Sequence, residues 1–308
     1  MSNTAHTQFI KKTALELGFM NVAIAKAEFM EPEAKMLEVW LNNGHQGSMD
    51  YMNNHFDLRV DPTKLVPGAK SVISLMYNYY TDEQQVAEAP KISMYALGKD
   101  YHKVVRKKLK HLFERMKDKI GHIEGRYFVD SAPILERDWA KRSGLGWTGK
   151  NTLTINPKLG SYFFLAEIIC DLPLDYDLPI KDHCGTCTRC IDACPTEAIS
   201  PQGYLLDSNK CISYLTIERK DDIPSQFKNK MEGYMYGCDI CQQVCPWNRF
   251  STHHKETAFH PNQDLLTMSK SEWMDLSEDT FNTLFEGCAV KRTKFKGLKR
   301  NINFLYKS

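Results

Sequence analysis

The sequence lacks the segments that would send a chain into a membrane or out of the cell. Its first residues, 1–6, contain neither the basic region nor the apolar core of a signal peptide, and no twin-arginine pair. No apolar run reaches the roughly eighteen residues that a membrane helix needs. We therefore expect a cytoplasmic protein without membrane contact, in a compartment where thiols stay reduced.

The sequence also lacks a strong net charge and low-complexity segments. Its only internal repeats are two cysteine runs. The net charge is +2 over 308 residues, which by itself does not call for a nucleic acid. Charged residues make up 25% and hydrophobic residues 42%, which is ordinary for a soluble globular chain. This length suggests two domains, or one large domain with an insert.

Eight of the ten cysteines lie between positions 184 and 245. They form a run C-x-x-C-x-x-C-x-x-x-C-P, a lone Cys211, and a run C-x-x-C-x-x-x-C-P. In bacterial ferredoxins three closely spaced thiolates hold one 4Fe–4S cubane, and the Cys before Pro ligates the other. Two cubanes need eight thiolates, so Cys211 completes the set. The first cysteine set is Cys184, Cys187, Cys190 and Cys245, and the second is Cys194, Cys211, Cys238 and Cys241.

Two other uses of cysteine fit the spacing less well. A zinc site wants four ligands in two pairs separated by a longer gap, and needs no Cys-Pro at the end of each run. Disulfides suit small secreted chains. Iron-sulfur clusters pass single electrons, so the next question is which group receives them.

Helices and strands alternate over the first 170 or so residues, which indicates an α/β or α+β domain. Hydrophobic patterns predict helices over 7–17, 32–40, 99–120 and 135–142, and Asp100 is a candidate N-cap of the third. The same patterns predict strands over 19–25, 72–76 and 126–130. Segments 152–155 and 161–170 are predicted to form a hairpin, and 270–285 a helix.

Asp130 ends an apolar strand before a Pro-containing turn. It is either an Asx-turn residue or, if it faces an apolar cavity, a carboxyl group with a raised pKa that acts as a general acid. Tyr101 and His102 are equally open: they begin a helix, or they contact a cofactor.

The glycine-rich stretch 144–151 matches neither common phosphate-binding motif. Its spacing is not that of a P-loop, and it leaves a helix and enters a strand, the reverse of a dinucleotide fingerprint. We expect its glycines to let the backbone approach a large flat or anionic ligand.

Two stretches concentrate positive charge. Residues 103–119 carry eight Lys or Arg against only Glu114 and Asp118, and the segment from Gly287 to Ser308 carries no acid. They are either solvated helix faces or a footprint for a polyanion. The basic residues of the second stretch are Lys291, Arg292, Lys294, Lys296, Lys299, Arg300 and Lys307.

The remaining cysteines and a histidine group offer no clear chemistry. Cys170 is expected to be buried, and Cys288 either buried or exposed. His253, His254 and His260 lie in a polar connection and are predicted to be surface residues.

Five further stretches, taken with the cysteine runs, resemble the epoxyqueuosine reductase family. They are RVDP at 59–62, YALGKDYH at 95–102, FVDSAP at 128–133, GLGWTGKN at 144–151 and CISYLTIE at 211–218. The resemblance covers nearly the whole chain in matching order. It implies the last step of queuosine synthesis, in which epoxyqueuosine in the anticodon loop of tRNA is reduced to queuosine. Many family members continue into a helical-repeat domain that helps to hold tRNA, whereas this sequence ends at Ser308.

The resemblance also implies the cofactors and the chemistry. Cobalamin would take electrons one at a time from two 4Fe–4S clusters, and the epoxide oxygen would leave as water, consuming two electrons and two protons. Asp130 would be the proton donor. The implied cobalamin contacts are Arg59, Tyr95, Asp100, Tyr101, His102, Asp130, Lys150, Asn151 and Ser213. Basic side chains would hold the RNA phosphates: Arg219, Lys220, Lys291, Arg292, Lys294, Lys296, Lys299 and Arg300.

The implied fold is α+β with three parts. Residues 1–176 would form an α/β, nitroreductase-like cobalamin domain, 177–255 a ferredoxin-like two-cluster domain, and 256–308 a basic helical segment that contacts tRNA. We expect a monomer that takes electrons from an external donor. The alternatives are a reductive dehalogenase-like, cobalamin-dependent reductase of a small molecule, and a non-catalytic electron-transfer protein.

Overall fold

The computed structural model describes residues 2–306. Its centre is a four-stranded sheet in the order β1-β2-β7-β4, antiparallel throughout. The strands are β1 (Asn21–Lys26), β2 (Ser71–Asn78), β4 (Gly125–Phe128) and β7 (Phe163–Cys170). Because no parallel βαβ unit occurs in this sheet, the predicted α/β or α+β domain is of the α+β kind. Within residues 2–306 no helix combines the length and apolar character of a membrane span.

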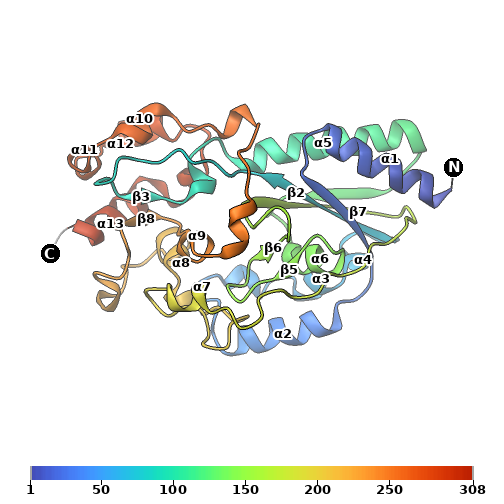
Figure 1. Cartoon of the computed structure of the whole chain (residues 1–308), viewed down its shortest axis with the longest axis horizontal. Helices are drawn as coiled ribbons and strands as arrows, with labels where there is room; N and C mark the ends of the chain where they lie inside the picture. Colours follow the sequence, from blue (N-terminus) through green and yellow to red (C-terminus); the bar gives the residue numbers. More distant parts are fainter. Residues whose placement is uncertain (1, 307–308) are drawn as a thin grey trace.

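Helices cover both faces of this sheet (Figure 1). On one face, α1 (Asn3–Glu16) and α5 (Tyr101–Ile120) pack against apolar side chains from all four strands. Helix α5 contributes Val105, Leu109, Leu112 and Met116 to this core. Asp100 caps α5 as predicted, because its carboxylate accepts from the His102 N–H. On the other face lie α6 (Glu136–Arg142) and α4 (Pro62–Leu65), followed outward by α2 (Glu31–Asn42) and α3 (Phe56–Val60).

The predicted hairpin of 152–155 with 161–170 is wrong. Strand β6 (Thr154–Ile155) pairs with β5 (Trp147–Thr148), whereas β7 pairs with β2 on one side and β4 on the other. The reason is burial: β7 is apolar and covered on both faces, so it is a central strand that needs neighbours along both edges.

A second core joins the C-terminal helices to a loop of the first half. Strand β3 (Lys91–Ile92) pairs in parallel with β8 (Tyr234–Tyr236), and both pack against α10 (Gln263–Thr267), α11 (Lys270–Met274), α12 (Glu278–Leu284) and α13 (Lys294–Tyr306). Asn301 lies fully buried in α13 and donates to the carbonyls of Thr216 and Met235. The predicted helix 270–285 is two helices, because Ser269 and Ser277 each cap a new N-terminus.

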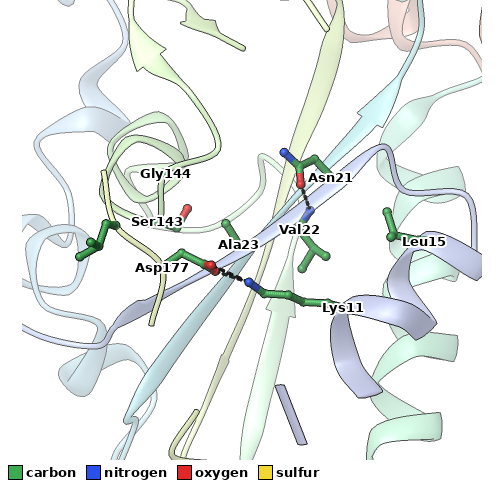
Figure 2. Close-up of a pocket in the computed structure, with 9 residues that line it drawn as sticks. Lys11, Leu15, Asn21, Val22, Ala23, Ser143, Gly144 and Asp177 are labelled. Carbon is green, nitrogen blue, oxygen red and sulfur yellow. Dashed lines mark hydrogen bonds and ion pairs between the residues drawn. The ribbon is translucent and has the colours of Figure 1, made fainter. Parts of the chain in front are cut away.

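The segment 184–245, which holds the eight cysteines, lies between these two cores (Figure 1). Besides β8 it carries three short α-helices: α7 (Arg189–Asp192), α8 (Ile212–Ile217) and α9 (Ile240–Gln243). The chain that leads into this segment is hydrogen-bonded at Asp177 to the edge strand β1. Asp177 accepts from the Ile24 N–H and from Lys11, and its own N–H donates to the Ile24 carbonyl. Figure 2 shows this ion pair across a surface pocket of about 370 Å³ beside β1. The cysteine loops are therefore held in a fixed position relative to the central sheet.

Candidate active site

The four thiols of the first cysteine set line one cavity of about 220 Å³. The cavity is also lined by Lys150, Arg189, Trp247 and Arg249. The indole N–H of the buried Trp147 points at the Cys184 sulfur, at 3.4 Å. Burial raises the pKa of Cys190 to about 11, and the adjacent thiols Cys184, Cys245 and Cys187 act in the same direction. The predicted members of this set therefore face one another.

The second cysteine set is also gathered in space. Burial raises the pKa of Cys241, and Cys238, Cys211 and Cys194 raise it further, together with Cys190 of the first set. The contact of α7 with α9 brings the two cysteine runs together. The influence of Cys190 on Cys241 shows that the two sets are neighbours.

The thiols surround a space rather than meeting at a point. Within residues 2–306 no three His, Cys, Asp or Glu side chains are placed to hold one metal ion. A tetrahedral zinc site would bring four sulfurs to about 2.3 Å from a single atom. Each thiolate of a cubane instead binds its own iron, so the ligands stand apart around the cluster. The donor set and its spacing fit two cubane clusters better than zinc.

Asp130 lies outside β4, at a sharp turn after the strand has ended at Phe128. Its φ is +48°, a left-handed conformation that is uncommon for a residue other than glycine. The Asp130 carboxylate accepts a hydrogen bond from the Tyr101 hydroxyl, and the His102 Nε2 lies 3.6 Å from Oδ2. Its side chain is 58% exposed. A strained backbone that presents a bonded carboxylate to solvent is typical of a functional site.

The pKa of Asp130 is not raised, contrary to the expectation for an apolar cavity. Burial of part of the turn opposes the charge, but His102 and Tyr101 outweigh it and lower the pKa of the carboxyl. The same pair acts on His102: burial favours the neutral ring, but Asp100 and Asp130 raise its pKa to about 9. At neutral pH the proton therefore lies on His102, between two carboxylates.

The second cysteine run is bonded to the segment that precedes this centre. Asp239, which is buried, accepts from the Ser93 hydroxyl and, at 2.7 Å, from the Met94 N–H. The next residue, Tyr95, packs edge to face on Tyr101, with ring centroids 6.1 Å apart. Tyr95, Asp100, Tyr101, His102 and Asp130 thus form one group next to the second cysteine set.

The other predicted cofactor contacts lie outside this group, and three of them have structural partners. Lys150 donates to the carbonyls of Gly185 and Cys187, and Asn151 donates to the carbonyl of Cys241. Ser213 lies two residues after Cys211, at the start of α8. Arg59 is buried and donates to the carbonyls of Tyr51 and Asn54.

The glycines of 144–149 serve the fold, which corrects the expectation of a close ligand approach. A Cβ on Gly144 would lie 2.2 Å from the Leu178 carbonyl oxygen, and one on Gly146 would lie 2.4 Å from that of Ile155. A Cβ on Gly149 would meet the Ile155 side chain at 2.5 Å. The absent side chains therefore make room for neighbouring backbone and core.

The predicted RNA contacts divide into two groups, one bonded to backbone carbonyls and one exposed. Arg219 belongs to the first group, because it donates to the Asp222 carbonyl. Lys299 donates to the carbonyls of Met274 and Leu276, and Arg300 donates to those of Leu215, Arg219 and Asp221. The hydrogen bonds of these two side chains attach α13 to the segments 274–276 and 215–221. The exposed members are Lys220, Lys291, Arg292, Lys294 and Lys296, of which Arg292 pairs with Glu218 at 2.8 Å. Lys307 lies outside the described residues.

The remaining cysteines and the histidine group have clear positions in the fold. Cys170 is fully buried, as expected, and Cys288 is buried too, with its thiol donating to the Ala96 carbonyl. His253 and His260 are exposed, but the prediction for His254 was wrong. His254 is buried because its ring packs edge to face on Phe259.

Two family models match this arrangement of residues. Positions 59–131 match the model described as epoxyqueuosine reductase QueG, DUF1730, and positions 183–248 match the 4Fe-4S double cluster binding domain. An epoxyqueuosine reductase of Cyclobacterium marinum is 57% identical over 97% of this chain and 96% of its own length. The chain belongs to the epoxyqueuosine reductase family. It is an oxidoreductase with two 4Fe–4S clusters.

Relatives in the epoxyqueuosine reductase family differ in length. The Escherichia coli K12 protein is 43% identical over 96% of this chain, which spans 79% of that protein. A solved epoxyqueuosine reductase with an epoxyqueuosine-modified tRNA-Tyr stem loop is similar to this chain in structure, with a TM-score of 0.85 and 30% sequence identity. The similarity covers 96% of this chain and 80% of the solved one. A catabolic reductive dehalogenase, NpRdhA, shares the fold alone, at 18% identity and a TM-score of 0.53 over 82% of this chain and 33% of its own.

Sequence reasoning missed three acidic residues, two of which lie near Asp130. Glu136 and Glu167 lie behind it and Asp239 lies beside the second cysteine set. A signal was present for Glu167, which is a lone acid within the apolar strand 163–170. Such a charge in a central strand is rare unless it is paired or functional.

Proposed function

We propose that this protein reduces epoxyqueuosine to queuosine in the anticodon loop of tRNA. The observation that carries the proposal is the group of Tyr101, His102 and Asp130. Tyr95 packs on Tyr101, and the preceding residues Ser93 and Met94 donate to Asp239 in the loop that holds the second cysteine set. A proton-donating centre thus lies beside an electron-delivering one. The stem loop bound in the solved relative supports tRNA as the substrate. A cytoplasmic monomer fits this role.

Cobalamin is the group that would join the two centres. When bound, it would supply a low-valent metal able to pass electrons to the epoxide carbon. Tyr95, Tyr101, His102 and Asp130 would hold it, together with Ser213 and the loop that carries Cys241. Supporting this fit, Tyr95 packs edge to face on Tyr101, whose hydroxyl donates to the Asp130 carboxylate, so three of these residues are in contact.

Asp130 would deliver a proton to the departing epoxide oxygen. In the free protein its partner His102 holds that proton, because the pKa of His102 is about 9. Substrate would cover the exposed carboxylate and remove water from it, which favours the neutral acid. The two side chains would then act together as one donor. In support, a solved Bacillus subtilis epoxyqueuosine reductase has a catalytic aspartate loop that can swing out of the active site.

Electrons would enter at the first cluster and leave from the second. The cavity lined by the first cysteine set also carries Arg189 and Arg249, and the exposed Phe250 lies beside Trp247. This surface suits an external donor with an acidic face. The second set lies beside the Asp130 group and would pass electrons onward.

The three-part organisation follows from these roles. Residues 1–176 would hold the corrin and the substrate base, 177–255 the clusters, and 256–308 would contact RNA. The third part shares a hydrophobic core with residues 86–97 of the first part. This core would hold the RNA-contacting helix α13 in a fixed position relative to the active site.

The test of this function is nucleoside mass spectrometry. Cluster-loaded protein is incubated anaerobically with cobalamin, a strong reductant and tRNA that contains epoxyqueuosine. We expect the modified nucleoside to lose the mass of one oxygen atom. Unchanged epoxyqueuosine in the presence of both clusters and bound corrin would reject the proposal. Reduction of a halogenated phenol alone would favour the dehalogenase-like alternative.

The exposed lysines around the start of α13 give a prediction on RNA affinity. Replacing Lys291, Lys294 and Lys296 with Ala should weaken tRNA binding and reduce the slope of log K against log salt by roughly two, because each phosphate contact in single-stranded RNA contributes about 0.7. Fluorescence anisotropy over a salt series measures both effects.

A matched variant separates this surface from the other basic stretch. Lys107, Lys110 and Lys117 are also exposed but lie on α5 beyond its first turn, away from α13 (Figure 1). Replacing them with Ala should leave the salt slope unchanged. Equal losses in the two triple variants would show that the attraction is diffuse and that α13 is not the RNA contact.

A further inference from the structure

The turn that carries Asp130 is held at two points. The Asp130 N–H donates to Glu136 Oε1 at 2.6 Å, and the Asp130 carboxylate accepts from the Tyr101 hydroxyl. The contact with Glu136 fixes only the backbone. His102 Nε2 lies 3.6 Å from the carboxylate, which is too far for a hydrogen bond, so the direction of the carboxyl group depends on Tyr101.

The place of Tyr101 in its helix does not by itself fix its ring. Tyr101 is the first residue of α5, and a helical side chain lies over the preceding turn, which is absent here. The Tyr101 side chain is nevertheless buried, with 8% exposed. Its position must therefore be set by the rings that enclose it.

Two rings lie against Tyr101. The Phe164 ring is parallel to it within 4°, with centroids 4.1 Å apart. The His102 ring is also 4.1 Å away, at 28°. Two rings this close and nearly parallel to a third would overlap if they shared one of its faces. Phe164 and His102 therefore cover opposite faces of Tyr101, and Phe164 is the one that comes from outside α5.

Phe164 is itself enclosed in the core. It belongs to the central strand β7 and is 7% exposed. Three further rings surround it: Tyr79, Phe259 and Tyr95, with centroids 4.6, 5.4 and 6.4 Å from that of Phe164. A ring packed in this way has little room to move, so Phe164 is a fixed support for Tyr101.

We propose that Phe164 is a positioning residue for the proton donor. By stacking on Tyr101, it holds the Tyr101 hydroxyl in the direction from which Asp130 accepts its hydrogen bond. Phe164 has no proton to give or take, so it acts only through Tyr101. This inference rests on the proposed function.

Hydrogen exchange followed by mass spectrometry tests this support in cluster-loaded protein without substrate. In Phe164→Leu the amides of residues 129–132 should exchange severalfold faster than in the wild type, because Asp130 loses its contact with a fixed hydroxyl and the turn opens more often. Exchange at the wild-type rate would show that Phe164 does not hold the turn.

Phe163→Leu is the matched control. Phe163 is the preceding residue of β7 and is 8% exposed, but it points to the opposite face of the sheet, where it packs with Ala140 and Leu145. This variant should lose stability as Phe164→Leu does and leave exchange at residues 129–132 unchanged. Equal acceleration in the two variants would overturn the proposal, because it would reflect a general loosening of the core.

The pH dependence of turnover separates positioning from loss of stability. Phe164→Leu should lower kcat about ten- to a hundredfold with little change in KM, because a small displacement of a catalytic group costs that much in rate. Burial favours the neutral His102 ring, but Asp100 and Asp130 raise its pKa to about 9, so wild-type turnover should fall above this pH. When Asp130 moves away, the pKa of His102 falls, and turnover should decline from a lower pH. Phe163→Leu should keep the wild-type profile.

A double variant tests whether Phe164 acts through Tyr101. Tyr101→Phe keeps the stacked ring and removes the hydroxyl. Combining it with Phe164→Leu should lower kcat no further than the larger of the two single losses. Losses that multiply, or an unshifted pH profile in Phe164→Leu, would overturn the proposal. If wild-type protein fails to reduce epoxyqueuosine at all, the proposed function fails, whereas the exchange result still decides whether Phe164 holds the turn.

Discussion

Asp130→Asn should lower turnover of epoxyqueuosine about a hundred- to ten-thousandfold, the usual contribution of a positioned general acid. The amide has nearly the same shape, so the turn at φ +48° and the contact with Tyr101 can persist. It has no proton to deliver, however, and it removes one of the two carboxylates that hold the proton on His102. Single-turnover assays followed by nucleoside mass spectrometry measure the loss.

Two controls make this result specific. Asp264→Asn changes an exposed carboxylate on α10 and should leave turnover unchanged. The visible absorption of the clusters and of bound corrin should be the same in Asp130→Asn as in the wild type. Activity within a few-fold of wild type would remove Asp130 from the acid role, and the Asx-turn interpretation would then stand.

Cys241→Ala should abolish turnover while it leaves half of the iron in place. Cys241 is predicted to ligate the second cluster, which lies next to the Asp130 group through the bonds of Asp239 to Ser93 and Met94. Without that cluster, electrons that reach the first one have no further carrier. Iron and sulfide analysis, with the absorbance of the remaining cluster after reduction, measures the effect.

The chain offers two comparisons for this variant. Cys288→Ala removes a buried thiol that donates to the Ala96 carbonyl and is no ligand, so it should keep all of the iron. Cys187→Ala should lose the first cluster instead, which shows whether the module folds with one cluster. A full complement of iron in Cys241→Ala would contradict the predicted ligand sets.

Much of the candidate site could be predicted from local patterns. The spacing of the cysteines is set by how a loop wraps a cubane, so both sets could be read from the sequence and are gathered in space. Helix α5 and its Asp100 cap depend on side-chain periodicity and on one local hydrogen bond, and both were predicted.

The features that could not be predicted depend on distant partners. Strand β7 lies between β2 and β4, which come from two other parts of the chain, so nearness in sequence favoured the wrong hairpin. The glycines of 144–149 accommodate Leu178 and Ile155, whose positions follow only from the fold. Lys299 and Arg300 look like phosphate contacts until the carbonyls that they bind are known.

The most direct test is an anaerobic titration of reduced, cluster-loaded protein with cobalamin, followed by visible and electron paramagnetic resonance spectra. We expect the corrin to bind and the clusters to be reoxidised as it is reduced, with transfer lost in Cys241→Ala and retained in Asp130→Asn. A protein that binds no corrinoid, or whose clusters stay reduced in its presence, would contradict the proposed path of electrons from the clusters to the nucleoside.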